Sequence, residues 1–143
     1  MDTLNFLQRV LPSAGFYVTT VINPDGRRQG FFATVEELAK AVVGLDQRGN
    51  NTYFAISAFV EKGNRKQENV RATKVIALDV DCGEGKPFPT WKEGLAATGK
   101  FIQQMSLPKP MIVHSGNGLH VYWSLTEELE PTRWKPLAEA MKA

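Results

Sequence analysis

Apolar residues in the first part of the chain recur at spacings that predict one short helix followed by a β-hairpin. The leucines of residues 4–11 fall on one side of a helix, and Pro12 would end that helix. Residues 16–22 are mostly β-branched or aromatic, as in a strand, and the Asn-Pro-Asp-Gly run at residues 23–26 is typical of a turn. We therefore expect residues 27–33 to pair back onto the first strand.

The rest of the chain continues with the same two periodicities. Thr34 and Glu37 have the spacing of a capping box, which predicts the start of a helix, and the Gly49-Asn50 pair predicts its end. The further expected elements are strands at residues 53–60, 75–81, 111–115 and 119–125 and helices at residues 90–105 and 131–143. The apolar side expected for the helix at 90–105 consists of Trp91, Leu95, Phe101, Ile102 and Met105. This order indicates the α+β class, with a mainly antiparallel sheet flanked by helices.

Length and composition are those of an ordinary globular domain. The chain has 143 residues, which suits one domain, and its 43% hydrophobic and 22% charged residues exclude a disordered tail and a collagen-like fibre. The single cysteine, Cys82, cannot form an internal disulfide, which favours a reducing compartment. Because no apolar run is long enough to cross a bilayer, we expect a cytoplasmic protein with no membrane partner.

A net charge of +2 does not by itself indicate a nucleic-acid partner, but basic residues gather in one segment. Residues 61–74 contain almost no large apolar side chains. The basic residues of this segment are Lys62, Arg65, Lys66, Arg71 and Lys74. The segment is either a solvated loop or an arm that contacts phosphates. It would separate an N-terminal α/β part, residues 1–60, from residues 75–143, within a single domain.

Two aspartates stand at the end of the most strand-like run of the chain. Asp79 and Asp81 are two residues apart, so their carboxylates would point to the same face of the strand. Two negative charges held so close are tolerated mainly where a divalent cation or a basic cluster lies between them. The pair therefore predicts either a site for Mg²⁺ or Mn²⁺ or a solvated strand end.

A glycine-rich turn joins the next two expected strands. Residues 115–118 read Ser-Gly-Asn-Gly, which is typical of a tight hairpin turn and also allows close approach of a ligand. His120 follows in an otherwise apolar or aromatic run, and a turn alone does not explain this histidine. Beside the carboxylate pair it could reach a phosphate oxygen, whereas His114 receives no role beyond the sheet.

Together these two motifs resemble those of the archaeo-eukaryotic primase superfamily, and most closely those of phage and plasmid primase-polymerases. The family's first motif, a hydrophobic residue followed by Asp-x-Asp, matches Asp79 and Asp81. Its second motif, of the form S-G-x-G-x-H, matches at Ser115, Gly116, Gly118 and His120. The resemblance covers residues 52–143 and implies an RRM-like catalytic core, of which residues 75–143 would form an incomplete part.

The resemblance implies template-directed, metal-dependent nucleotidyl transfer by a DNA primase or DNA polymerase. Asp79 and Asp81 would bind catalytic Mg²⁺ or Mn²⁺. The residues implied to hold the triphosphate are Ser115, Gly116, Asn117, Gly118 and His120. Arg65 and Lys66, in a looser match upstream, would contact phosphate or template. The implied partners are single-stranded DNA, NTP or dNTP, and a helicase domain or protein, in the host cytoplasm of a phage or plasmid.

The family's third motif is a further carboxylate on a later strand, and it has no counterpart among the strands expected in residues 1–143. The acidic residues that follow His120, none of which falls in an expected strand, are Glu127, Glu128, Glu130 and Glu139. The resemblance therefore implies that the catalytic domain continues past Ala143 and that residues 1–143 alone lack the full carboxylate set. The missing strand would leave an open sheet edge, through which copies of the chain could associate.

Two other functions compete with this one. The first is a non-catalytic module that binds single-stranded nucleic acid without metal, with Tyr53, Tyr122 and Trp123 either stacking on bases or packing in the core. The second is a replication-initiator nickase, which needs a His-x-His metal pair. His120 supplies one histidine where that site needs two, so the nickase is disfavoured.

Overall fold

The computed structural model describes residues 2–48, 51–114 and 118–142. The chain divides into two compact units. Unit 1 comprises Met1–Lys74 and Thr126–Ala143, and unit 2 comprises Val75–Leu125. Strands β5 (Val70–Asp81) and β7 (Gly118–Leu129) each begin in one unit and end in the other.

The beginning of unit 1 follows the expected pattern. Its first elements are α1 (Thr3–Val10), β1 (Tyr17–Asn23), β2 (Gly26–Phe32), α2 (Val35–Gln47) and β3 (Asn51–Phe54). Helix α1 starts where the Asp2 carboxylate accepts the Asn5 backbone N–H at 2.8 Å. The Thr34 hydroxyl accepts the Glu37 N–H at 3.1 Å, which confirms the predicted helix start. Strands β1 and β2 form the predicted antiparallel hairpin.

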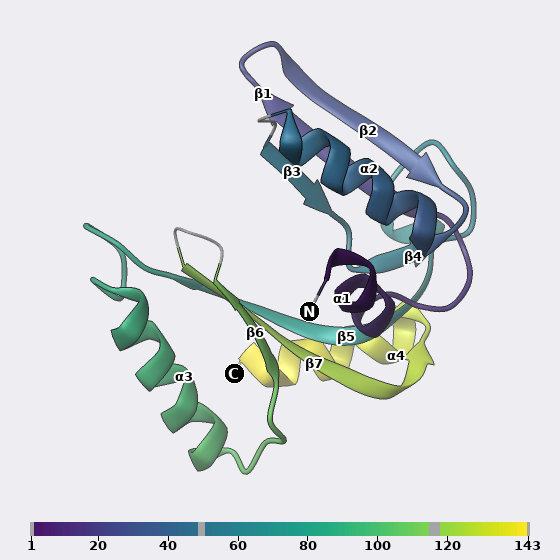
Figure 1. Ribbon diagram of the computed structural model, residues 1–143. Helices are drawn as coiled ribbons and strands as arrows, with labels where there is room; N and C mark the ends of the chain where they lie inside the picture. Colours follow the sequence, from purple (N-terminus) through teal and green to yellow (C-terminus); the bar gives the residue numbers. More distant parts are fainter. Residues whose placement is uncertain (1, 49–50, 115–117, 143) are drawn as a thin grey trace. The chain divides into compact units, whose positions relative to one another are not determined.

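Helix α2 lies against a three-stranded antiparallel sheet of order β2-β1-β3, as Figure 1 shows. The core of unit 1 lies around it. The buried members of this core are Leu7, Leu11, Tyr17, Leu38, Ala39 and Ala58. The Tyr17 hydroxyl donates to the Pro12 carbonyl oxygen at 2.6 Å, so the phenol is buried without losing its hydrogen bond.

The expected strand at residues 53–60 is wrong, because the chain changes sheets in its middle. Strand β3 ends at Phe54 and pairs with β1, whereas β4 (Ser57–Phe59) pairs with β5. The basic loop is also shorter than expected. Residues 67–69 form a single 3₁₀ turn, η1 (Gln67–Asn69), and β5 begins directly after it at Val70. Residues 70–74 therefore belong to a strand, which their partners in β4 stabilise.

Unit 1 is completed by the end of β7 and by α4 (Pro131–Lys142), which confirms the final helix. Strand β7 runs four residues further than expected, to Leu129, so Glu127 and Glu128 lie in a strand after all. Both carboxylates have a cationic partner, and that of Glu127 is Arg133 at 3.5 Å. Glu128 accepts from Ser13 at 2.7 Å and pairs with Arg71 at 3.2 Å.

Unit 2 consists of the second part of β5, α3 (Trp91–Gln104), β6 (Met111–His114) and the first part of β7. Its strands have the order β5-β7-β6, so β7 fills the place between two strands that α3 connects. The Thr90 hydroxyl accepts the Glu93 N–H at 3.3 Å and starts α3 where predicted. The expected apolar side of α3 is partly wrong: Trp91, Leu95 and Met105 are exposed, and the buried residues are Gly94 and Thr98.

Mixed helices and two antiparallel sheets confirm the α+β class. An RRM-like core stays a prediction, although the order strand, helix, strand, strand in unit 2 agrees with it. Within the described ranges, no helix is long and apolar enough to cross a membrane.

Candidate functional site

The two faces of β5 differ sharply in the segment that carries the aspartates. Asp79 and Asp81 are exposed, while Val80 between them is half-buried and Cys82 is buried. A side chain placed on Gly94 would lie 2.7 Å from Cys82 Sγ and 3.1 Å from Val80 Cγ1. Helix α3 therefore covers the Val80 face through a glycine contact, and within unit 2 it leaves the carboxylates on the opposite face.

Strand β7 approaches this part of β5 closely. A Cβ atom on Gly118 would collide with the Val80 carbonyl oxygen and would lie 3.3 Å from the Asp81 Cα. Only glycine fits between the two backbones without moving one of them. This close approach brings the start of β7, and with it His120, beside the aspartate segment.

His120 meets the first aspartate directly. Its Nε2 atom lies 2.9 Å from Asp79 Oδ1, which is a hydrogen bond when the ring is neutral and an ion pair when it is protonated. The Asp79 side chain is 77% exposed and that of His120 is 38% exposed. The two motifs, 41 positions apart in sequence, thus share one solvent-accessible site on neighbouring strands.

Tyr122 extends this contact along β7. Its hydroxyl lies 3.4 Å from His120 Nδ1, and the two rings meet edge to face at 86°. Burial, and after it the negative charge of Asp79, raises the pKa of Tyr122 to about 12. The phenol therefore keeps its proton at neutral pH and can donate it to Nδ1. A neutral His120 then carries its own proton on Nε2, facing Asp79.

Tyr122 is the site residue whose role the sequence analysis missed. The two-residue alternation of a strand, which already placed Asp79 and Asp81 together, also places His120 and Tyr122 on one face. Tyr122 and Trp123 are 6% and 5% exposed, so neither offers the open stacking face considered for a nucleic-acid module. Tyr53, in unit 1, is 54% exposed.

The histidine of β6 lies elsewhere. Val113 stands opposite His120 and His114 opposite Leu119 in the β6–β7 register. The His114 ring lies 5.3 Å from the Trp91 ring at the start of α3. His114 therefore belongs to the helix-covered face and not to the Asp79 site.

The remaining predicted site residues lie outside the described residues or in the other unit. Ser115, Gly116 and Asn117 lie outside the described residues. Arg65 and Lys66 belong to unit 1, whereas the aspartates and His120 belong to unit 2. With the Gln29 amide oxygen turned toward it, Arg65 Nε lies 2.7 Å from that oxygen.

Asp79 and Asp81 could bind a metal ion only together with further ligands. Across the described part of the chain, no three His, Cys, Asp or Glu residues are grouped closely enough to hold a metal ion by themselves. Asp79 and Asp81 nevertheless present oxygen ligands to solvent. Mg²⁺ is commonly held by one or two carboxylates, with water and substrate phosphates completing its shell. The two residues fit that arrangement, in which a phosphate-bearing ligand would bring part of the coordination.

Comparison with protein-family models, with curated proteins and with solved structures found no match to this chain. The geometry of the site and the two sequence motifs are therefore what bears on function.

Proposed function

We propose that the Asp79 site binds a nucleoside triphosphate with Mg²⁺ or Mn²⁺ and belongs to a primase-polymerase that copies a single-stranded template. The observation that carries this proposal is the 2.9 Å contact between Asp79 Oδ1 and His120 Nε2. It joins the two motifs on which the resemblance depends, and it joins them on an exposed face.

Each group has a role that follows from its chemistry. Asp79 and Asp81 supply the carboxylate oxygens that bind the divalent cation. The bound cation would polarise the α-phosphate and favour attack by a 3′-hydroxyl, with pyrophosphate as the leaving group. His120 donates from Nε2 to a phosphate oxygen. Tyr122, by donating to Nδ1, keeps that proton on Nε2.

The contact between Asp79 and His120 also has a consequence for binding. Asp79 Oδ1 and His120 Nε2 face each other, so each occupies the position that a ligand of the other would take. A cation on Asp79 and a phosphate on His120 would replace this single contact with two. Cation and triphosphate should therefore bind together more tightly than either binds alone.

Calorimetry of ATP and dATP binding, with Mn²⁺ or with EDTA, tests the proposal. We expect the unmodified chain to bind nucleotide only with Mn²⁺, and the double variant Asp79→Asn, Asp81→Asn to lose that binding. His120→Ala should weaken binding by about tenfold or more, because a hydrogen bond to a charged group contributes roughly 1.5–3 kcal/mol.

Glu84→Gln is the matched control. Glu84 is an exposed carboxylate of unit 2 three residues after Asp81, and its replacement removes one carboxylate charge outside the motif. It should leave nucleotide binding unchanged. Binding of equal strength in EDTA, or an unaltered affinity in the Asp79, Asp81 double variant, contradicts the proposal.

A further inference from the structure

A second candidate site lies entirely in unit 1. A cavity of about 280 Å³ is formed between α4 on one side and β4, η1 and the start of β5 on the other. The lining residues with polar or aromatic side chains are Ser57, Gln67, Thr73, Trp134, Lys135 and Glu139. None of them belongs to the Asp79 site. The volume is near the lower end of the range for small-molecule sites, about 300–1,000 Å³, and suits one ring system with little attached.

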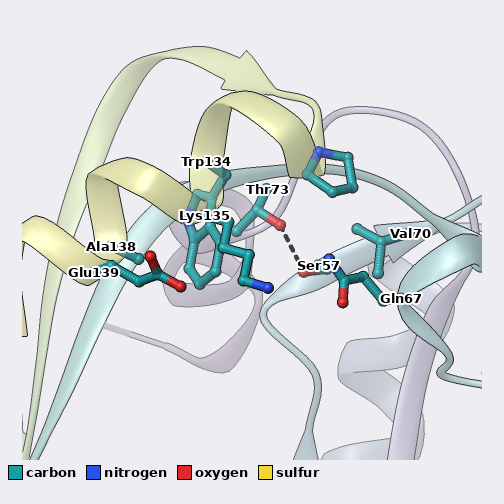
Figure 2. A pocket seen from close by; sticks show the side chains of 9 residues that line it. Ser57, Gln67, Val70, Thr73, Trp134, Lys135, Ala138 and Glu139 are labelled. Atoms are coloured by element: carbon teal, nitrogen blue, oxygen red, sulfur yellow. Dashed lines mark hydrogen bonds between the residues drawn. The ribbon is translucent and has the colours of Figure 1, made fainter.

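The α4 side of this cavity offers an aromatic wall and two opposite charges. Figure 2 shows the Trp134 indole beside the Lys135 and Glu139 side chains, which come from the same helix. Indole is the side chain best suited to stack on a flat ligand. Because Lys135 and Glu139 oppose each other in charge, the cavity suits neither a simple anion nor a simple cation. It suits a neutral ligand with both donors and acceptors.

The strand side supplies hydroxyl and amide groups. Ser57 Oγ and Thr73 Oγ1 lie 2.6 Å apart, and this one bond uses only one of their two hydroxyl hydrogens. One O–H at the bottom of the cavity can therefore donate to a ligand acceptor. Gln67, at the edge, offers one further acceptor and two donors.

The residue that precedes the lining residue Gln67 in the chain carries a positive charge. Lys66 is exposed and immediately precedes Gln67; its backbone bonds to Asn64 and Asn69, while its side chain has no hydrogen bond, ion pair or ring contact within the described residues. The other cations of the loop are already engaged, since Lys62 Nζ lies 5.6 Å from the Phe16 ring and Arg65 faces Gln29. The ammonium group of Lys66 is thus available to pair with a phosphate of a ligand that binds in the cavity.

We propose that this cavity binds one unpaired nucleobase, stacked on Trp134, with its phosphate on Lys66. A nucleobase is flat, neutral, and lined with donors and acceptors, as the cavity requires. The base can belong to a single strand or to a free nucleoside, and the phosphate contact favours the strand. Identifying that strand as the template depends on the proposed function, whereas the chemistry of the cavity does not.

The test uses the whole chain in EDTA, so that the Asp79 site contributes nothing. The probes are adenosine, a labelled oligodeoxyadenylate, and the abasic counterpart of that oligonucleotide. We expect adenosine to quench the fluorescence of the unmodified chain and of Trp91→Phe, but not that of Trp134→Phe. Trp91 is the matched control, because it is an exposed tryptophan in unit 2.

Affinities for the oligonucleotide separate the two sources of the base. Trp134→Ala should weaken binding of the oligodeoxyadenylate by roughly 5- to 150-fold, the measured range for loss of one stacked base. Trp134→Phe keeps a smaller ring and should weaken it less, which guards against a folding defect in the alanine variant. Lys66→Gln should weaken binding of the oligonucleotide but not of adenosine. Equal effects of Lys66→Gln on both ligands would contradict the proposed contact between Lys66 and the phosphate.

Two outcomes overturn the proposal: adenosine and the oligonucleotide both fail to bind, or they bind folded Trp134→Ala as tightly as the unmodified chain. The abasic oligonucleotide should bind as weakly as oligodeoxyadenylate binds Trp134→Ala. The Asp79→Asn, Asp81→Asn variant should bind all three probes normally. Loss of Mn²⁺-dependent ATP binding with normal behaviour in EDTA would therefore remove the proposed function and leave this site intact.

Discussion

The two faces of β5 near its end show how neighbouring residues take opposite roles. On one face, Val80 and Cys82 meet Gly94 of α3 at distances that leave no room for a further carbon. On the other face, Asp79 is 77% exposed and touches His120. The packed face fixes the position of the strand, and the open face can then hold charged groups that contribute little to packing.

The same difference recurs along β7. Leu119 and Val121 are buried, while His120 between them is half-buried and contacts Asp79. Functional and packing residues therefore alternate on both strands. A polar group on the open face can be changed with little loss of stability, whereas a change of one methyl group on the packed face should be costly.

Gly118→Ala should disturb both faces of β5 and have the largest effect on stability, because both faces depend on the spacing of β5 and β7. The new methyl group would collide with the Val80 carbonyl oxygen, and a backbone atom cannot move aside as a flexible side chain can. We expect the free energy of unfolding to fall by about 3 kcal/mol, the upper part of the usual range for overpacking. Urea denaturation measures this loss, and an unchanged midpoint would show that the two strands are not so close.

Gly94→Ala tests the packed face alone, and Gly99→Ala on the same helix is its control. Nothing lies within 4 Å of a Cβ at Gly99, so alanine there should stabilise α3 by about 1 kcal/mol through helix propensity. At Gly94 the same gain is opposed by the contacts with Cys82 and Val80. We expect unfolding free energies of the two variants to differ by about 1–3 kcal/mol. Equal stabilisation by both would mean that α3 does not pack on this face.

Local patterns were enough to predict most elements of this fold and part of its site. The cap at Thr34, the hairpin around Gly26 and the helix start at Thr90 are all confirmed, because their signals lie within a few residues. The common face of Asp79 and Asp81 follows from alternation along a strand.

What local patterns missed depends on contacts distant in sequence. The break after Phe54 arises because β3 and β4 find partners in different sheets. Gly94 is buried because strand β5 lies against it. The positions of the large apolar residues of α3 therefore did not predict which side of this helix faces the sheet. The Asp79–His120 contact requires β7 beside β5, and no spacing within either strand specifies that pairing.

Tyr122→Phe tests the open face and should have the smallest effect on stability. It removes the hydroxyl that lies 3.4 Å from His120 Nδ1, and the loss of one hydrogen bond costs about 1 kcal/mol. The pH dependence gives a sharper signature. Since folding raises the pKa of Tyr122 to about 12 from an ordinary value of 10.0, its contribution is complete below pH 10 and is lost as the pH rises toward 12.

Ultraviolet difference absorbance during an alkaline titration follows that ionisation directly. The step near pH 12 should be absent from Tyr122→Phe, and the variant should lose less stability than the unmodified chain between pH 10 and 12. Tyr17, whose pKa is also raised by burial, contributes to both proteins and cancels in the difference. A difference step near pH 10 in place of the step near pH 12 would mean that the Tyr122 hydroxyl ionises like one in water. Neither burial nor the charge of Asp79 would then raise the pKa of Tyr122. The hydrogen bond that orients the His120 ring would lose its support.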